Sequence, residues 1–217
     1  MDIAEAVRRI ELAEEFSFDE AALSVVGQAA IATEEDGRRL ARALFNNYWG
    51  LPKKKNHEQW AEFVMEKIQS RPDREAACMH LLRCIRESWA QIDIRLKEKF
   101  VFLLEKIIEE AIKTAENPIS QFIVKGPAAE YDLPIMRAVI KSRPVFSPEE
   151  AEYLLEYLLK TADTYFTNFF IQNILPQLRK EGVSQKLAEK AYSEGSKRGR
   201  SPKMAELLYA IYECRAK

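Results

Sequence analysis

Apolar residues recur along most of this chain at the spacing of an amphipathic helix, and the strict alternation typical of a half-buried strand is almost absent. The pattern is clearest over residues 94–115, where Phe100, Leu103 and Ile107 form one stripe and Leu104 widens it. A helix that is apolar over so broad an arc packs against neighbours on two sides, as in a stack of helical pairs. The pattern predicts an all-helical protein with no sheet.

Capping residues and prolines predict where the helices begin and end. Thr33 precedes three acids, and Ser147-Pro148-Glu149-Glu150 places Ser at the N-cap and Glu at the third helical position, which is the capping-box pattern. Ser201-Pro202 predicts a third helix start of the same kind. Because proline disfavours helix at the residue before it, we expect helix ends at Gly50-Leu51-Pro52, Arg71-Pro72, Asn117-Pro118, Gly126-Pro127, Arg143-Pro144 and Gly182.

These boundaries predict about eleven helices, joined by short loops and arranged as successive antiparallel pairs. No consensus recurs at a fixed period, which excludes tetratricopeptide and ankyrin arrays. We therefore expect an all-α, irregular HEAT-like helical-repeat solenoid. It should form a single elongated domain over residues 1–217, with a candidate hinge near residues 117–130.

Length and composition are typical of a soluble, helix-rich protein. A chain of 217 residues, of which 31% are charged and 47% hydrophobic, has a substantial core available. No apolar run approaches the length of a membrane span, and the acidic start lacks a signal-peptide core, so we expect no membrane contact. The 3 cysteines cannot all pair with one another, which suits a reducing compartment such as the cytosol or the nucleus.

The net charge of -1 conceals separate acidic and basic blocks. Residues 1–36 hold ten acids and two arginines, whereas residues 37–57 hold six Lys or Arg and no acid. Residues 179–217 hold ten Lys or Arg and five acids. Such blocks favour surfaces of opposite sign, and hence partners of both signs, although each block could also be an ordinary solvated helix face.

The sequence offers little material for catalysis or metal binding. The only histidines are His57 and His80, and the spacing of Cys78, His80 and Cys84 sends three side chains of a helix in different directions, so buried cysteines are the favoured interpretation. No glycine-rich phosphate loop is present. Adjacent acids such as Glu109-Glu110 and Glu149-Glu150 diverge on a helix and are expected to be solvated. We expect no catalytic residue, metal site, cofactor or small-molecule substrate, and no enzymatic activity.

Two segments carry a resemblance to a known family. Residues 86–108, RESWAQIDIRLKEKFVFLLEKII, contain Trp89, Ile92, Asp93, Lys99 and Phe100. These residues match the spacing of the signature W-x-x-I-D-x5-K-F. Residues 40–53, LARALFNNYWGLPK, carry a second match through Leu40, Leu44, Phe45, Trp49 and Lys53. In both, the chain resembles ribosomal RNA-processing protein 1, a nucleolar factor of large-subunit assembly. It departs from that pattern at Gln91 in place of Gly, Leu96 in place of Arg, and Ser88 as an insertion.

The resemblance implies a non-enzymatic scaffold in pre-60S assembly and ribosomal RNA processing. It implies a location in the nucleus and nucleolus. It also implies company with other pre-ribosomal proteins, including Brix-domain and WD40-type assembly factors. Two alternatives remain open at this point, namely a HEAT-like protein-interaction adaptor unrelated to ribosomes and a HEAT-like nucleic-acid enzyme such as an alkylpurine glycosylase.

The signature residues favour a structural role. Trp49 and Trp89 are large residues at predicted helix ends and should anchor one helical pair on the next. Asp93 precedes a helix and can accept hydrogen bonds from its first N–H groups, while Lys99 is expected to reach an acid on a neighbouring helix. The aromatic segment Tyr165-Phe166 with Phe169-Phe170 is expected in the core, with an exposed partner-binding patch as the alternative.

Two basic clusters are the candidate contacts to precursor ribosomal RNA. The first, Lys53, Lys54 and Lys55, is expected in a loop, and the second, Lys197, Arg198, Arg200 and Lys203, lies near the start of the last predicted helix. Such side chains can reach an RNA backbone through its phosphates without reading sequence. Either cluster could instead be a nuclear-import signal.

Overall fold

The computed structural model describes residues 1–13, 18–52, 54–113, 122, 131–142, 147–161 and 164–215. Every regular element in these ranges is a helix, and extended pairing there is confined to an isolated parallel bridge between Val183 and Arg215. The all-helical prediction is confirmed for this part of the chain. The chain divides into two compact units, Met1–Ala115 (unit 1) and Glu116–Lys217 (unit 2). The single domain stays a prediction, and the candidate hinge at 117–130 lies, except for Phe122, outside the described residues.

Unit 1 contains six α-helices and three short 3-10 helices among its described residues. In chain order these are α1 (Ile3–Glu11), α2 (Glu20–Leu23), η1 (Ser24–Gly27), α3 (Glu34–Gly50), α4 (Lys54–Gln69), α5 (Arg74–Ser88), η2 (Trp89–Gln91), η3 (Ile94–Leu96) and α6 (Lys97–Ala111).

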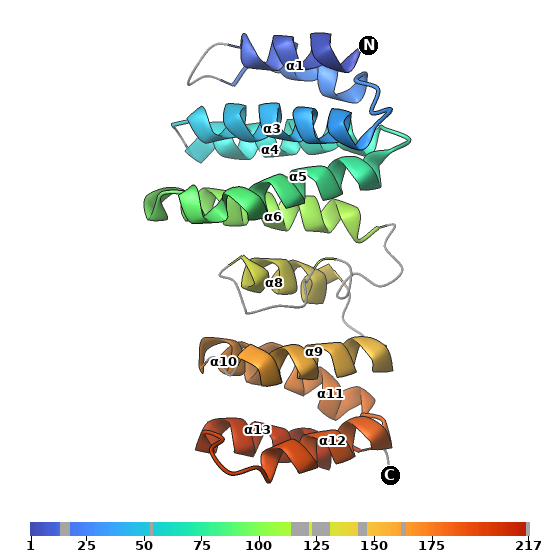
Figure 1. Ribbon diagram of the computed structural model, residues 1–217, viewed down its shortest axis with the longest axis vertical. Helices are drawn as coiled ribbons and strands as arrows, with labels where there is room; N and C mark the ends of the chain where they lie inside the picture. The colour runs from blue at the N-terminus through green and yellow to red at the C-terminus, as the bar shows by residue number, and fades with distance from the viewer. Residues whose placement is uncertain are drawn as a thin grey trace. The chain divides into compact units, whose positions relative to one another are not determined.

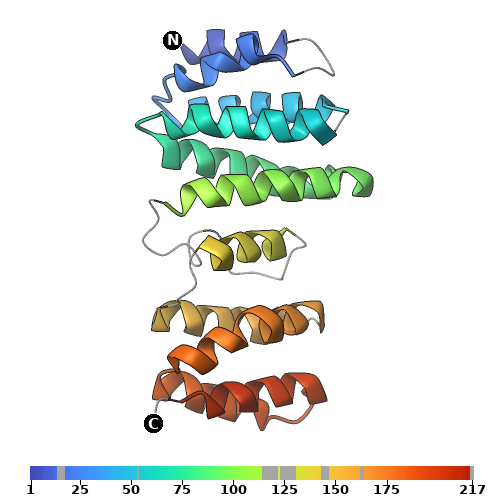
Figure 2. The same ribbon diagram turned by 180° about the vertical axis from the view of Figure 1, so that it is seen from behind.

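The helices of unit 1 stack in layers. On one side α3 contacts both α1 and α5, and on the other side α4 contacts both η1 and α6. Figure 1 shows α1, α3 and α5 nearest the viewer, and Figure 2 shows α4 and α6 from behind. The faces that meet are apolar at helical spacing and wholly or almost wholly buried, including Leu44, Trp60, Val64, Ile85, Leu103 and Leu104.

The start of α3 matches its predicted cap. The Thr33 hydroxyl accepts a hydrogen bond from the N–H of Asp36 at 3.1 Å, and the Asp36 carboxylate accepts one from the N–H of Thr33 at 3.0 Å. Three acids in the first turn also suit the positive end of the helix dipole. The predicted end at Gly50 is confirmed as well, since α3 stops at that residue.

A buried arginine ties the end of α4 back to η1. Arg71 is only 4% exposed, and its guanidinium donates to the carbonyl oxygen of Val26 and to both carboxylate oxygens of Asp73, the latter at 2.7 and 2.8 Å. Burial of this charge is tolerated because it is paired and hydrogen-bonded. The side chain thus links two layers that lie 45 residues apart in sequence.

Unit 2 is also built from helices in its described part. They are α8 (Asp132–Ser142), α9 (Pro148–Thr161), α10 (Thr164–Asn173), α11 (Leu175–Glu181), α12 (Gln185–Gly195) and α13 (Pro202–Glu213). The most extensive packing is between α12 and α13, while α9 contacts α10 and α12, and α13 also contacts α10 and α11. Gly182 ends α11 with a positive φ of 79°, which glycine adopts without the strain of a Cβ.

The core of unit 2 contains the aromatic segment that the sequence singled out. Phe166, Phe169 and Phe170 are 2%, 5% and 0% exposed, so the core prediction is confirmed for them and the exposed-patch alternative is wrong. The side chain of Tyr165 lies outside the described residues. The Tyr157 hydroxyl adds a buried polar contact by donating to the carboxylate of Asp132.

Two sequence-based expectations about helices need correction. The helix predicted over 94–115 begins at Lys97, because Asp93 caps the separate 3-10 turn of η3 before it. Two of the acids expected to be solvated are buried. Glu150 is 1% exposed because it completes the capping box with Ser147, and Glu110 is 6% exposed, with Lys113 pairing to it.

Candidate functional site

The two segments that carry the family resemblance meet in one junction of unit 1. The Phe100 ring of α6 lies 5.2 Å from the Phe45 ring and 5.7 Å from the Trp49 ring of α3, measured between centroids. Tyr48 adds an edge-on contact to Phe100 at 5.4 Å. Phe100 and Tyr48 are fully buried, whereas Trp49 is half-buried. We call this group, together with Lys99, the Lys99 junction.

Lys99 does not reach an acid as the sequence suggested. Its side chain is buried, and its Nζ donates to the carbonyl oxygens of Trp49 at 2.8 Å and Leu51 at 2.9 Å. The reason is that α3 ends at Gly50, and the last carbonyls of a helix have no partner within it and lie at its negative end. The ammonium therefore caps the C-terminus of α3 from a different helix.

Burial shifts the pKa values of two residues in this junction. Loss of solvent lowers the pKa of Lys99 from 10.5 to about 8, since burial disfavours the charged form of a base. Loss of solvent also raises the pKa of Tyr48 well above its usual value, with the charge of Glu58 as a smaller cause. The Tyr48 hydroxyl donates to the main-chain oxygen of Lys99 at 2.9 Å, so each residue holds the other in place.

His57 lines an open cavity beside the junction. Its Nε2 lies 2.6 Å from the Leu51 oxygen, which requires that nitrogen to donate, and burial lowers the pKa of the ring. The cavity has a volume of about 380 Å³ and is lined by Lys54, His57, Glu58, Arg95, Glu98, Lys99 and Phe102. Because the main chain takes up two of the three donors of Lys99 and one nitrogen of His57, these groups support structure more than proton transfer.

The remaining signature residues also play structural parts. Trp89 is 6% and Ile92 4% exposed, which confirms that the first is buried at a helix end. Asp93 accepts from the N–H of Arg95 at 2.9 Å, as its predicted capping role requires. Hydrogen bonds from Arg95 lower the pKa of Asp93 to about 2.

The first basic cluster is only partly where the sequence placed it. Lys53 lies outside the described residues, and Lys54 and Lys55 are the first two residues of α4, so the prediction of a loop is wrong for them. Pro52 ends the preceding segment, but good helix formers follow it at once. Both lysines are exposed, and Lys54 has one weak ion pair with Glu58 at 3.8 Å.

The second basic cluster lies at the turn between α12 and α13, as predicted. Gly199 forms that turn with a φ of 91°, and the Ser201 hydroxyl caps α13 by accepting from the N–H of Met204. Lys197 and Arg200 both pair with Glu194, at 2.5 and 2.7 Å. Arg198 and Lys203 are exposed and are the cluster's more available cations.

The two clusters share a position at a helix start, which the sequence predicts only for the second of them. Lys55 and Lys203 each occupy the second position of a helix whose first turn contains no acid. Cations there face the positive end of the helix dipole, which costs stability but places positive charge beside free N–H groups, where phosphate binds well. The sequence signal was a lysine directly after each helix start.

The Cys78, His80 and Cys84 spacing produces buried side chains, as favoured from the sequence. Both thiols are buried, and burial raises the pKa of Cys78 to about 12 and raises that of Cys84. Within the described ranges no group of three or more His, Cys, Asp or Glu residues is arranged to hold a metal ion. None of the described helices has both the length and the apolar character that crossing a bilayer needs.

Comparison with known proteins gave no family for this chain. No protein-family model matches it, and no curated protein matches its sequence.

Proposed function

We propose that this protein is a non-enzymatic scaffold in the assembly of the large ribosomal subunit, acting on the pre-60S particle during ribosomal RNA processing. The observation that carries the proposal is the Lys99 junction. Two segments that resemble the family separately, around Trp49 and around Phe100, pack against each other and exchange hydrogen bonds. Chance matches scattered along a helical chain have no reason to meet in space, so their meeting supports the resemblance.

The layered packing of unit 1 supports the finer part of the proposal, an irregular HEAT-like solenoid. In such a stack each helical pair contacts only its neighbours, as the contacts of α3 with α1 and α5, and of α4 with η1 and α6, illustrate. Stacks of this kind present long continuous faces to partners, which suits a protein that holds other factors and RNA together.

The basic clusters supply the proposed RNA contact. Lys54 and Lys55 in unit 1, and Arg198 and Lys203 in unit 2, are exposed cations at or near helix starts. We propose that both clusters contact phosphates of precursor ribosomal RNA without reading its bases. Proteins of the pre-ribosomal particle, among them Brix-domain and WD40-type factors, would hold the remaining surface. The proposed location is the nucleolus.

Sedimentation of the full-length protein in its own cells tests this function. A tagged chain should travel with particles that contain precursor RNA of the large subunit, and depletion should reduce mature large subunits relative to small ones. A useful control is Phe100→Ala, which should weaken the junction and remove the protein from the particle by lowering its folded fraction. If the wild-type chain stays at the top of the gradient and depletion leaves subunit ratios unchanged, the ribosomal role is wrong and a general adaptor replaces it.

A further inference from the structure

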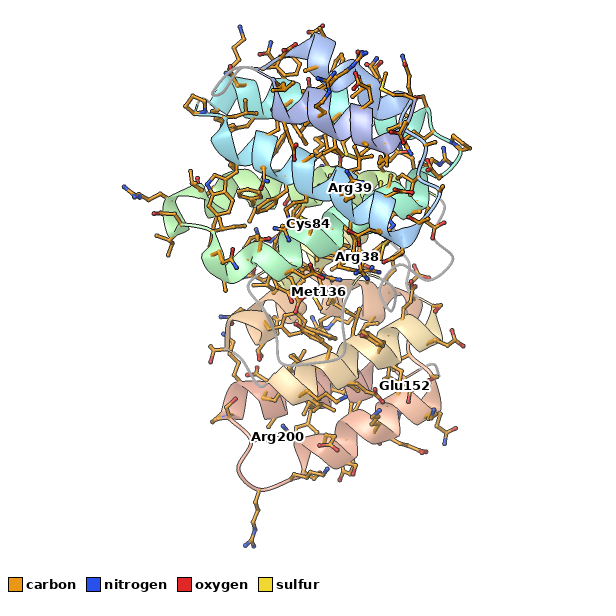
Figure 3. All side chains as sticks on the ribbon, turned by 45° about the horizontal axis from the view of Figure 1, so that its top comes forward. Arg38, Arg39, Cys84, Met136, Glu152 and Arg200 are labelled. Carbon is orange, nitrogen blue, oxygen red and sulfur yellow. The ribbon has the colours of Figure 1, made fainter. Side chains whose placement is uncertain are left out.

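A second open cavity lies on the side of unit 1 formed by α1, α3 and α5. It has a volume of about 400 Å³. From α3 it is lined by Glu35, Arg38, Arg39 and Arg42, from α5 by His80, Arg83, Cys84 and Glu87, and from α1 by Val7 and Glu11. The lining residues of α3 and α5 follow the same helical spacing, so each helix turns one stripe toward the cavity. Figure 3 shows Arg38 and Arg39 on α3 and Cys84 on α5.

The four arginines of this cavity differ in how far their charges are already paired. Arg83 donates to the carboxylate of Glu34, and Arg38 lies 3.6 Å from the same carboxylate. Arg42 donates to the hydroxyl of Ser88 at 2.9 Å, which is a neutral partner. Arg39 has no ion pair or hydrogen bond among the residues that the structure describes, and its side chain is exposed. Two guanidinium groups, Arg39 and Arg42, thus lack a carboxylate in the described part of the chain.

His80 supplies a second, independent feature of the same cavity. The residue is 8% exposed, and its Nε2 lies 3.7 Å from a carboxylate oxygen of Glu34. Its Nδ1 is buried and has no hydrogen-bond partner among the described residues. Buried polar atoms are nearly always paired, so His80 brings to the lining of this cavity a ring with one nitrogen that the packing leaves unsatisfied.

The charges around the cavity decide which ligand fits. Glu11, Glu35 and Glu87 line it together with the arginines. An RNA strand would bring its phosphates close to three carboxylates, and each such approach is repulsive. A peptide carries single carboxylates that can pair with the two guanidinium groups that lack a carboxylate partner, and its N–H groups can donate to the glutamates of the lining. The mixed lining therefore favours a peptide over a nucleic acid.

We propose that this cavity, the Arg39 site, binds an acidic peptide segment of a partner protein, whose carboxylates pair with Arg39 and Arg42. The proposal rests on the proposed scaffolding function, because it assigns one partner-binding surface of that scaffold. Glu34 illustrates the chemistry within the chain, since its carboxylate already lies among Arg38, Arg83 and His80. A partner carboxylate would complete the row of guanidinium pairs along α3.

Fluorescence anisotropy with the purified full-length protein tests the Arg39 site. The probe is a labelled peptide rich in serine and glycine that carries two glutamates, the matched control replaces both glutamates by glutamine, and a labelled oligouridylate represents RNA. We expect the glutamate peptide to bind, and the Arg39→Glu/Arg42→Glu variant to bind it at least about tenfold more weakly. Arg179→Glu/Lys180→Glu changes the net charge equally on α11 and should leave peptide binding unchanged.

Two further measurements keep the test decisive. If the charge-reversed variant fails to fold, Arg39→Gln/Arg42→Gln removes the charges with little change in size and should give the same decrease in affinity. Cys84 lines the cavity, so in a Cys214→Ser background the bound glutamate peptide should slow modification of Cys84 by a thiol reagent. Cys78 is fully buried and should react more slowly than Cys84 in either state.

The outcomes separate this site from the proposed function. Equal binding of the glutamate and glutamine peptides, or unchanged binding by both arginine variants, would overturn the Arg39 site. Stronger binding of the oligouridylate through Arg39 and Arg42 would overturn it in favour of RNA. Each of these results can occur while the wild-type chain still sediments with pre-60S particles, so the Arg39 site can be wrong although the proposed function is right. Conversely, the glutamate peptide can bind although the chain does not sediment with pre-60S particles.

Discussion

At the scale of single residues, Lys99 is the clearest case of a side chain whose hydrogen-bond donors serve structure although its charge is buried. A protonated lysine has three N–H donors and a neutral one has two, and the main chain of Trp49 and Leu51 offers two acceptors. Loss of the proton therefore costs neither hydrogen bond. Removal of the charge from a buried position is favourable, which is the physical meaning of a pKa lowered to about 8.

We expect the stability of the protein to gain a contribution from Lys99 as pH rises from 8 to 10.5. In that window the unfolded lysine is still protonated while the folded one is not, so the unfolded state binds more protons and stability increases with pH. The full contribution is about 3 kcal/mol. Urea unfolding of the wild type and Lys99→Met at several pH values isolates it. Parallel pH dependence of the two proteins would contradict the prediction.

The packing of His80 against α3 gives a second prediction at this scale. A Cβ added to Gly37 would lie 2.2 Å from Cδ2 and Nε2 of the buried His80 ring, so the ring would have to leave its position. Gly37→Ala should therefore destabilise the protein by about 1–2 kcal/mol, despite the better helix propensity of alanine. Gly50 has no atom within 4 Å of its added Cβ, so Gly50→Ala should be neutral or slightly stabilising.

A double-mutant cycle checks this explanation. In a His80→Ala background the ring is absent, and Gly37→Ala should then stabilise the protein instead of destabilising it. Thermal unfolding of the four proteins provides the measurement. If Gly37→Ala costs the same with and without the ring, the overlap with His80 is not its cause.

At the scale of elements, the local sequence predicts where helices begin better than it predicts where charged side chains lie. The caps at Thr33, Ser147 and Ser201 are found as expected, because capping depends on residues within one turn. The predicted helix end at Gly50-Leu51-Pro52 leads us to expect Lys54 and Lys55 in a loop. Helix α4 instead begins at Lys54, since its buried residues Trp60, Val64 and Ile68 reward helix formation.

The lysine in the second position of α4 predicts a conflict between stability and binding. Lys55→Glu places a carboxylate at the positive end of the helix and should stabilise the protein by about 0.3–1 kcal/mol. The same change should weaken association with precursor RNA, because it removes a cation and adds an anion. Urea unfolding and particle sedimentation measure the two effects.

Two matched variants test the helix dipole as the cause. Lys203→Glu is the equivalent change in α13 and should also stabilise. Lys67 lies in the last turn of α4, so Lys67→Glu should destabilise. A decrease in the stability of Lys55→Glu would show that this lysine makes a favourable contact within the folded chain.

At the scale of the whole molecule, the sequence predicted the helical class but not its cavities. The Arg39 site combines stripes from α1, α3 and α5. Each stripe can be recognised in the sequence, yet no local sequence pattern predicts that these three stripes line the same cavity. For the same reason the sequence predicts an acid as the partner of Lys99, since a helix-end carbonyl that lies 50 residues away leaves no signal in composition or spacing.

The two basic clusters lie in different units, which permits a test at this scale. Replacement of Lys54 and Lys55, or of Arg198 and Lys203, by serine should leave the melting temperature nearly unchanged, because all four side chains are exposed. Each replacement should weaken RNA association and flatten its salt dependence, by about one unit of slope for each phosphate that the protein no longer neutralises. If both variants enter particles at the wild-type level and no RNA crosslinks form near either cluster, the proposed RNA contact is wrong. The clusters are then solvated surface or a nuclear-import signal.

The hydrogen bonds that cross the layers of unit 1 bear on how that unit opens. Helical stacks commonly unfold one layer at a time, and terminal layers exchange their amide protons first. Here Arg71 donates to the carbonyl oxygen of Val26, and Lys99 donates to the carbonyl oxygens at the end of α3. Separating any of these layers would leave a buried cation or carbonyl without its hydrogen-bond partner. We expect the amides of α3, α4 and α6 to exchange through one common opening, which makes unit 1 more cooperative than its layered form suggests.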